Sequence, residues 1–203
     1  MQTPWKLNLF AKGELVKPNK ILIIRFSALG DLVLTTPIFR ELKRVFPDAE
    51  ITLLTSSGTG SVLNNNPHID HFIWHKRKES YRELNKLIKK LHKEKFNLVY
   101  DAHRSLRSIW IVWNLTRFRF HTTPKVWLIN KRSWQRSLLI NFKLNFLNNT
   151  PPQRQHLLLP LQNQTSLVLN NHTELFPDLN LSLIHIWRCR RYSLCRSRWS
   201  PYH

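Results

Sequence analysis

A short apolar run that ends in a small-residue turn constrains the fold of this chain more than any other feature. Residues 20–25 read Lys-Ile-Leu-Ile-Ile-Arg, and residues 26–31 continue as Phe-Ser-Ala-Leu-Gly-Asp. A β-branched run of this length is typical of a buried strand, and a Gly-containing turn directly after it is typical of the change from strand to helix. The sequence therefore predicts a buried strand, a tight turn and a helix in succession.

The residues after this turn complete a βαβ unit. Apolar side chains recur at helical spacing from Leu32 to Phe46, Pro47-Asp48 ends the predicted helix, and residues 50–55 read as a second strand. At the start of that helix, the dipole and the free backbone N–H groups favour an anion. Asp31 places an ionisable side chain at the same point.

Further segments repeat the alternation of strands and helices. We expect a short strand at residues 69–75, a helix at residues 80–95 with a lysine-rich outer face, and a buried strand at residues 97–100. A helix is expected after Asp101, and the side chains that it presents to the sheet are predicted to be Leu106, Ile109, Trp110 and Trp113. This alternation predicts an α/β fold with a Rossmann-like, doubly wound parallel sheet.

Two blocks of this pattern resemble a known enzyme family. The first comprises Ser27-Ala-Leu-Gly-Asp31 and Thr35-Thr-Pro37, and the second is Asn97-Leu-Val-Tyr-Asp-Ala-His-Arg-Ser-Leu-Arg-Ser108. Over roughly residues 20 to 160 the chain resembles glycosyltransferase family 9, the ADP-heptose:lipopolysaccharide heptosyltransferases. The resemblance implies a two-domain enzyme of the GT-B type, of which this chain holds the N-terminal half.

The domain organisation expected from this resemblance has four parts. Residues 1–19 form an N-terminal extension, residues 20–150 a Rossmann-like acceptor-side domain, and residues 151–180 a truncated interdomain region. Residues 181–203 shift in composition toward Arg, Ser, Trp and Cys, which indicates adapter or out-of-frame sequence that is not native. If these residues are native, they form a basic arm for nucleic acid or a membrane.

The charge balance indicates an anionic partner. The 203 residues contain 32 Lys and Arg against 12 Asp and Glu, a formal charge of +20, and the stretch from Ala102 to Thr173 has no acidic residue. Basic residues interleaved with tryptophans are typical of nucleic-acid binding and also of contact with a membrane surface. Composition leaves both alternatives open, and the resemblance favours lipid A and its inner-core sugars over nucleic acid.

The candidate site lies where the predicted strands end. Because the carboxyl ends of parallel strands share one edge of a sheet, we expect both matched blocks to meet in one crevice. The resemblance implies that Asp31 is the general base toward the acceptor hydroxyl, whereas an N-cap of the helix is the alternative structural role. Residues expected to bind the acceptor are Ser27, Gly30, Arg104 and Arg107. For the two arginines, a solvated charge on the surface is the alternative role. Gly30 is also expected to serve the turn geometry, and Asp101 to fix the loop after its strand.

No metal and no cofactor are expected. The ten histidines are scattered, and Cys189 and Cys195 lack the spacing of a zinc site. The donor implied by the resemblance is ADP-heptose, held mainly by a C-terminal domain, and no βαβ pattern follows residue 160. The N-terminus lacks the features of a signal peptide, and no apolar segment reaches about 18 residues. We therefore expect a cytoplasmic protein that associates peripherally with the inner membrane.

Two hypotheses of function remain. The first is a truncated lipopolysaccharide core heptosyltransferase, which transfers heptose from ADP-heptose to the inner core when full length and is inactive without its donor-binding domain. The alternative is a non-catalytic, basic α/β module that binds nucleic acid or another polyanion. The oligomeric state is not predicted by either hypothesis.

Overall fold

The structure, a computed structural model, describes residues 17–76, 80–117, 124–129, 153–165 and 169–176. Within these ranges five parallel strands form one sheet in the order β3-β2-β1-β4-β5. The strands are β1 (Lys20–Arg25), β2 (Glu50–Ser56), β3 (His71–His75), β4 (Leu98–Asp101) and β5 (Lys125–Leu128). The chain builds outward from β1 on one side and then on the other, so the predicted doubly wound parallel sheet is confirmed.

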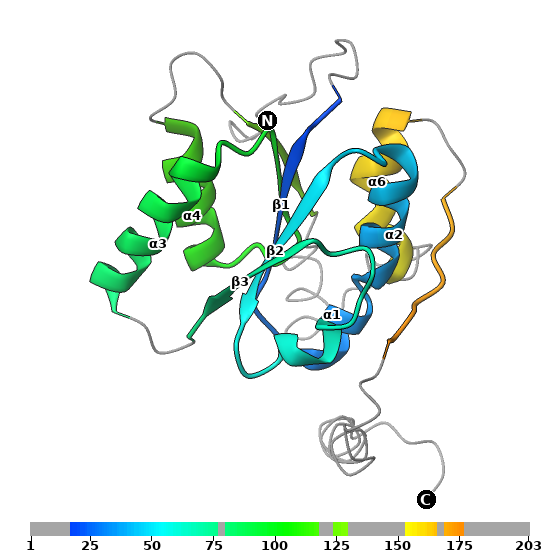
Figure 1. The fold of residues 1–203 in the computed structure, drawn as a ribbon, viewed down its shortest axis with the longest axis horizontal. Helices are drawn as coiled ribbons and strands as arrows, with labels where there is room; N and C mark the ends of the chain where they lie inside the picture. The colour runs from blue at the N-terminus through cyan, green and yellow to red at the C-terminus, as the bar shows by residue number, and fades with distance from the viewer. Residues whose placement is uncertain (1–16, 77–79, 118–123, 130–152, 166–168, 177–203) are drawn as a thin grey trace, which may run out of the picture.

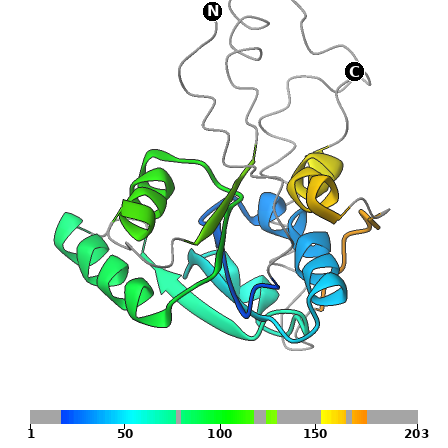
Figure 2. The same cartoon turned by 90° about the horizontal axis from the view of Figure 1, so that it is seen from above.

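Helices cover both faces of this sheet (Figures 1 and 2). On one face lie α1 (Leu29–Val33), α2 (Thr36–Val45) and α6 (Gln153–Thr165), and on the other lie α3 (Tyr81–Glu94) and α4 (Leu106–Arg117). A short 3-10 helix, η1 (Gly60–Leu63), follows β2. Most of the predicted N-terminal extension, much of the acid-free stretch beyond Arg117 and the tail at 181–203 lie outside the described residues.

The central strand explains why the apolar run predicted this fold. Ile21 and Ile23 of β1 pack into the core on the side of α2, while Leu22 and Ile24 pack into the core on the side of α3 and α4. All four side chains are fully buried. A strand covered on both faces needs apolar residues at every position, which produces a continuous run rather than an alternating one.

The helix predicted from Leu32 to Phe46 is divided in the structure. The break lies between α1 and α2, because Pro37 has no N–H to continue the helical ladder toward Val33. Two hydroxyls compensate at the break: Thr35 Oγ1 donates to the carbonyl of Leu32 (2.6 Å) and Thr36 Oγ1 to that of Val33 (2.8 Å). The prediction of a single long helix was therefore wrong, although the predicted end of the helix before Pro47 is confirmed.

The prediction for α3 is confirmed in its essentials. Leu84, Ile88 and Leu91 are buried against the sheet, whereas Tyr81 is 79% exposed. Ser80 is the N-cap of this helix, and its N–H donates to Glu83 Oε2 at 2.9 Å. The lysines of the outer face are exposed, namely Lys86, Lys89, Lys90 and Lys93.

The face of α4 that meets the sheet was predicted wrongly. The side chains expected to face the sheet lie outside instead, with Leu106 88% exposed and Trp110 and Trp113 each 42% exposed. The buried residues are Ser108, Ile111, Val112 and Leu115. At 100° per residue these two sets lie on nearly opposite sides of the helix, so helical periodicity alone does not decide between them.

Helix α6 contributes to the same core as the sheet. Leu157, Leu158 and Leu161 are buried beside α2 and the sheet. Tyr100 of β4 donates its hydroxyl to the carbonyl of Leu157 at 2.6 Å. Burial raises the pKa of Tyr100 above its ordinary range, so this phenol stays neutral and remains a donor. The domain boundary predicted at residue 150 is not tested by this packing.

Asp70 ties the beginning of β2 to α2. Its Oδ2 accepts the N–H of Ile51 (2.7 Å) and lies 2.8 Å from Lys43 Nζ. Burial raises the pKa of Asp70, but the hydrogen bonds from Lys43 and Ile51 outweigh this effect and lower the pKa below the ordinary value of an aspartate. The charged carboxylate therefore stabilises the folded chain.

We expect the stabilisation by Asp70 to disappear in acid. A carboxylate whose folded pKa is lowered stabilises the fold above its unfolded pKa, and this contribution is lost as the pH falls through the folded pKa. Asp70→Asn should cost about 1 kcal/mol of unfolding free energy at pH 7 and almost nothing well below pH 4. Urea unfolding of both chains at several pH values measures the difference. A cost independent of pH would contradict this account of Asp70.

Candidate active site

The candidate site lies at the edge of the sheet where β1 and β4 end. These strands pair in parallel, with Ile24 opposite Asp101, so the loops that follow them leave the sheet side by side. The first loop leads into α1 and contains Ser27, and the second leads from Ala102 into α4. The two matched sequence blocks therefore meet at one edge, as predicted.

Arg25, the last residue of β1, connects the two loops. Its side chain is only 5% exposed. Its Nη1 donates to the carbonyl of Ala102 in the loop after β4, and its Nη2 forms an ion pair with Asp31 Oδ2. A planar guanidinium can make both contacts at once and hold them in a fixed geometry. Arg25 therefore fixes the position of Asp31 relative to the second loop.

Asp31 combines a fixed position with access to solvent. It is the third residue of α1, and its Oδ2 accepts a long hydrogen bond (3.4 Å) from the N–H of Ala28. The helix begins at Leu29, so Asp31 is not its N-cap, and its own carboxylate occupies the place where the sequence predicted a bound anion. The side chain remains 37% exposed. A carboxylate that is held in place and partly exposed can accept a proton from a bound hydroxyl.

Gly30 does not have the role in turn geometry that the sequence predicted. It lies inside α1 and does not have a positive φ angle, so this backbone does not require a glycine. A Cβ built at Gly30 would meet nothing within 4 Å. The space in front of Gly30 is therefore open, and a ligand can approach the backbone beside Asp31.

Asp101 fixes the loop after β4, as the sequence predicted. Its Oδ1 accepts the backbone N–H groups of His103 (2.9 Å) and Arg104 (2.7 Å). These bonds hold Arg104 in the left-handed region at φ 47°, which is uncommon for a residue with a Cβ. The Arg104 side chain then donates from Nη1 to the carbonyl of Ile129 (3.0 Å), just past β5.

The other predicted acceptor-binding residues lie in different surroundings. Ser27 is half-buried in the loop between β1 and α1. Arg107 is the second residue of α4 and lines a groove between α3 and α4, together with Tyr81 and Trp110. The structure thus brings Ser27, Gly30, Asp31 and Arg104 to the loops at one edge but places Arg107 in the groove. Their roles in acceptor binding stay predictions.

A cluster of aromatic rings lies next to the sheet edge where β1 and β4 end. This cluster was not predicted from the sequence. The ring of Phe26 contacts the ring of His75, at the end of β3, with 5.1 Å between centroids, and the ring of His103 with 5.3 Å between centroids. Thr59 Oγ1 also donates to the carbonyl of Phe26 at 3.3 Å. These contacts join the loops after β1, β2 and β4 to the end of β3.

Arg25 is the candidate functional residue that sequence reasoning missed. An arginine at the end of an apolar strand is usually assigned to the solvated end of that strand. The available signal was the short spacing between Arg25 and Asp31, which places opposite charges at the two ends of one turn. Its other partner, Ala102, is 77 residues away and could not be inferred from local spacing.

The described residues contain neither a metal-binding cluster nor a helix suited to span a membrane. No group of three or more His, Cys, Asp or Glu side chains in the described part of the chain is arranged to hold a metal ion. Among the described helices, none combines the length and apolar character needed to cross a membrane.

Comparison with known sequences gives a partial match. No family model matches the chain. Lipopolysaccharide heptosyltransferase 3 of Escherichia coli is 34% identical over 93 residues, which cover 43% of this chain and 26% of that protein. The chain therefore spans about a quarter of the length of this curated relative.

Comparison with solved structures extends the match to most of the described fold. A glycosyltransferase of family 9 from Veillonella parvula superposes with a TM-score of 0.58 at 19% identity, covering 86% of this chain and 48% of that one. The ADP-heptose lipopolysaccharide heptosyltransferase II of E. coli gives a TM-score of 0.53 at 19% identity, covering 86% and 50%. The resemblance to glycosyltransferase family 9 is confirmed, and the fold is that of one half of these GT-B type enzymes.

Proposed function

We propose that this chain is the acceptor-side half of a heptosyltransferase that extends the core of lipopolysaccharide. The observation that carries the proposal is the pairing of a partly exposed Asp31 with a buried Arg25 at the carboxyl edge of the sheet. The partial match to lipopolysaccharide heptosyltransferase 3 supports the same reaction class. The acceptor is a sugar hydroxyl of the phosphorylated inner core, and the donor is ADP-heptose.

In the proposed reaction Asp31 acts as the general base. The acceptor oxygen attacks the anomeric carbon of heptose, the bond from that carbon to the diphosphate breaks, and ADP leaves with the electron pair. The hydroxyl proton passes to the Asp31 carboxylate as the new glycosidic bond forms. Arg25 would keep the carboxylate in one orientation beside the acceptor hydroxyl.

The departing ADP requires groups outside this half. A nucleoside diphosphate leaves readily only when positive charges or backbone donors stabilise its developing charge. Helix α1 gives little support, because it has five residues and its N-terminus already receives the Asp31 carboxylate. A second domain supplies the donor site in this proposal.

A transfer assay tests the proposed function. We expect the 203-residue chain to transfer no heptose from ADP-heptose and to show no measurable affinity for the donor. An enzyme in which a donor-binding C-terminal domain follows residue 180 should transfer heptose to a truncated inner-core acceptor. Radiolabelled heptose incorporated into that acceptor is the readout.

The same assay can reject the proposal. A folded two-domain enzyme that binds ADP-heptose yet transfers nothing to any inner-core acceptor would contradict it. The non-catalytic alternative would then gain support if the chain bound duplex DNA with the salt dependence of a diffuse polyanion contact.

A further inference from the structure

Helix α4 has two apolar faces, and the sheet buries only one of them. Ile111, Val112 and Leu115 pack against the sheet, while Leu106, Trp110 and Trp113 lie on the outer face. A surface helix ordinarily carries one apolar stripe and a polar remainder. The outer face of α4 therefore has the composition of a surface that contacts a second apolar phase.

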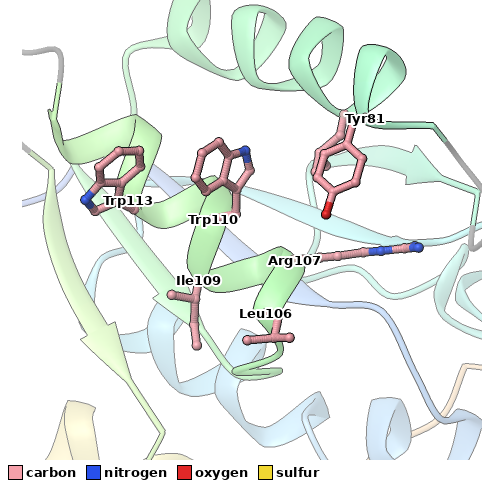
Figure 3. A pocket seen from close by; sticks show the side chains of 7 residues that line it. Tyr81, Leu106, Arg107, Ile109, Trp110 and Trp113 are labelled. Carbon is pink, nitrogen blue, oxygen red and sulfur yellow. The ribbon is translucent and has the colours of Figure 1, made fainter.

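This outer face borders a groove beside α3. Leu84 forms part of its wall and Tyr81 stands at its end, and the cavity has a volume of about 670 Å³. Figure 3 shows Trp113, Trp110 and Tyr81 in one row between the two helices, with Arg107 extending from the start of α4. The ring centroids of Trp110 and Trp113 lie 5.2 Å apart, so the two indoles form one continuous aromatic surface.

The rim of the groove is basic. The guanidinium of Arg117 lies 4.5 Å from the ring centroid of Trp113, and Arg107 lines the groove directly. Helices α3 and α4 together carry seven Lys and Arg against two Glu. On α3, helical spacing places Lys89 on the Tyr81 side, whereas Glu83 and Glu94 project on the opposite side.

We infer that this groove is the site at which the protein docks on an anionic lipid bilayer. Trp and Tyr favour the boundary between headgroups and acyl chains, because their rings are apolar and their N–H or O–H groups remain hydrated. Arg and Lys beside them keep their charges among the headgroups while their stems cover apolar surface. Trp, Tyr and Arg are also enriched at protein interfaces, whereas the lysines that α3 carries beside the groove are of a residue type depleted there. The lysines therefore favour a lipid surface, and a second copy of the chain is the competing occupant to be tested.

Docking through the groove would also orient the candidate active site. Helix α3 begins after β3 and α4 begins after β4, so Tyr81, Leu106 and Arg107 lie toward the carboxyl edge of the sheet. Asp31 lies at the same edge but does not line the groove. The inference therefore stands on the groove alone and survives if Asp31 proves to have no role in transfer.

Vesicle sedimentation of the full chain tests this inference. Vesicles of phosphatidylglycerol and phosphatidylethanolamine should bind the chain, and phosphatidylcholine vesicles should bind it much less. Measurements at high salt screen the diffuse attraction of the +20 charge and leave the apolar contribution of the groove. Under these conditions Trp110→Ala combined with Trp113→Ala should weaken partitioning at least about tenfold.

Two further variants separate docking from folding. Trp74→Ala is the matched control, because Trp74 is 43% exposed but lies on β3, outside the groove; its partitioning should equal that of the unchanged chain. Leu106→Glu should also weaken partitioning about tenfold. Its side chain is 88% exposed and an acid suits the first turn of a helix, so the fold should be kept.

Three outcomes would overturn the inference. One is equal partitioning of the groove variants and the unchanged chain, and another is an equal loss in Trp74→Ala. The third is a chain that is dimeric without lipid and that Leu106→Glu converts to a monomer, since a second copy would then occupy the groove. Light scattering distinguishes this last case.

Discussion

Asp31→Asn should lower the turnover of the two-domain enzyme by about a hundredfold or more, the scale expected when a positioned general base is removed. An amide of nearly the same shape can still accept the N–H of Ala28 but cannot take up the proton of the attacking hydroxyl. Donor affinity and the KM for the acceptor should change little, because the loss lies in the chemical step. Steady-state kinetics with varied acceptor measures kcat and KM separately.

The stability of the Asp31→Asn chain provides a second observable. Arg25 is buried, so removal of its counter-charge should cost about 1 to 2 kcal/mol, less than for a fully buried pair because Asp31 is partly exposed. Rates must therefore be expressed per folded molecule, with the folded fraction taken from circular dichroism. Turnover within about threefold of the unchanged enzyme would show that Asp31 is only structural.

Arg25→Met should also lower turnover, by about tenfold to a hundredfold, although Arg25 is a positioning residue and does not itself accept the proton. Methionine has a similar length and leaves Asp31 free to rehydrate, so the unfolding free energy should fall by only about 1 kcal/mol. Arg25→Met should thus cost less stability than Asp31→Asn. Arg25→Met should cost less because Arg25 is the buried partner of the ion pair. Its removal leaves the partly exposed Asp31 in contact with water, whereas removal of the Asp31 charge leaves a buried guanidinium without its counter-charge.

Two control variants test whether Arg25 acts by positioning Asp31. Arg44→Met removes another ion-paired arginine, on α2 and bound to Glu41, and should leave turnover unchanged. The double variant of Arg25 and Asp31 should be no slower than Asp31→Asn alone, because a positioning effect disappears with the group it positions. Additive losses in kcat would contradict the positioning role.

The central fold could be predicted from sequence because local chemistry and global topology agree there. The run from Ile21 to Ile24 is apolar at every position because helices cover both faces of β1. The strand after residue 97 and the loop role of Asp101 follow from the same logic, in which a buried strand ends at a polar residue that binds the next turn.

The predictions that the structure contradicts concern segments whose local sequence pattern fits two different structures. On α4 the stripe containing Trp110 looks as suitable for the core as the stripe containing Ile111, and only the packing of the sheet selects the second. The division between α1 and α2 was visible in Thr36-Pro37, since a proline cannot continue a helical ladder. It was overlooked because apolar spacing persists across the break.

The candidate site was predicted in part. Asp31 was found because it ends a recognisable turn, whereas Arg25 depends on a contact with Ala102 across two strands. Arg104 and Arg107 looked equivalent in sequence, yet a left-handed backbone turns one toward β5 while the other lies on α4. Such distinctions come from tertiary geometry, which residue spacing does not encode.

Binding of a deacylated, phosphorylated inner-core saccharide to the isotope-labelled chain tests the central claim most directly. Removal of the acyl chains excludes the groove between α3 and α4 as an apolar site. The account predicts amide shift changes that cluster at Ser27, Gly30, Asp31 and residues 102–105, and that persist in Asp31→Asn. Shift changes confined to the groove, or their absence at saturating saccharide, would contradict the assignment of this sheet edge as the acceptor site.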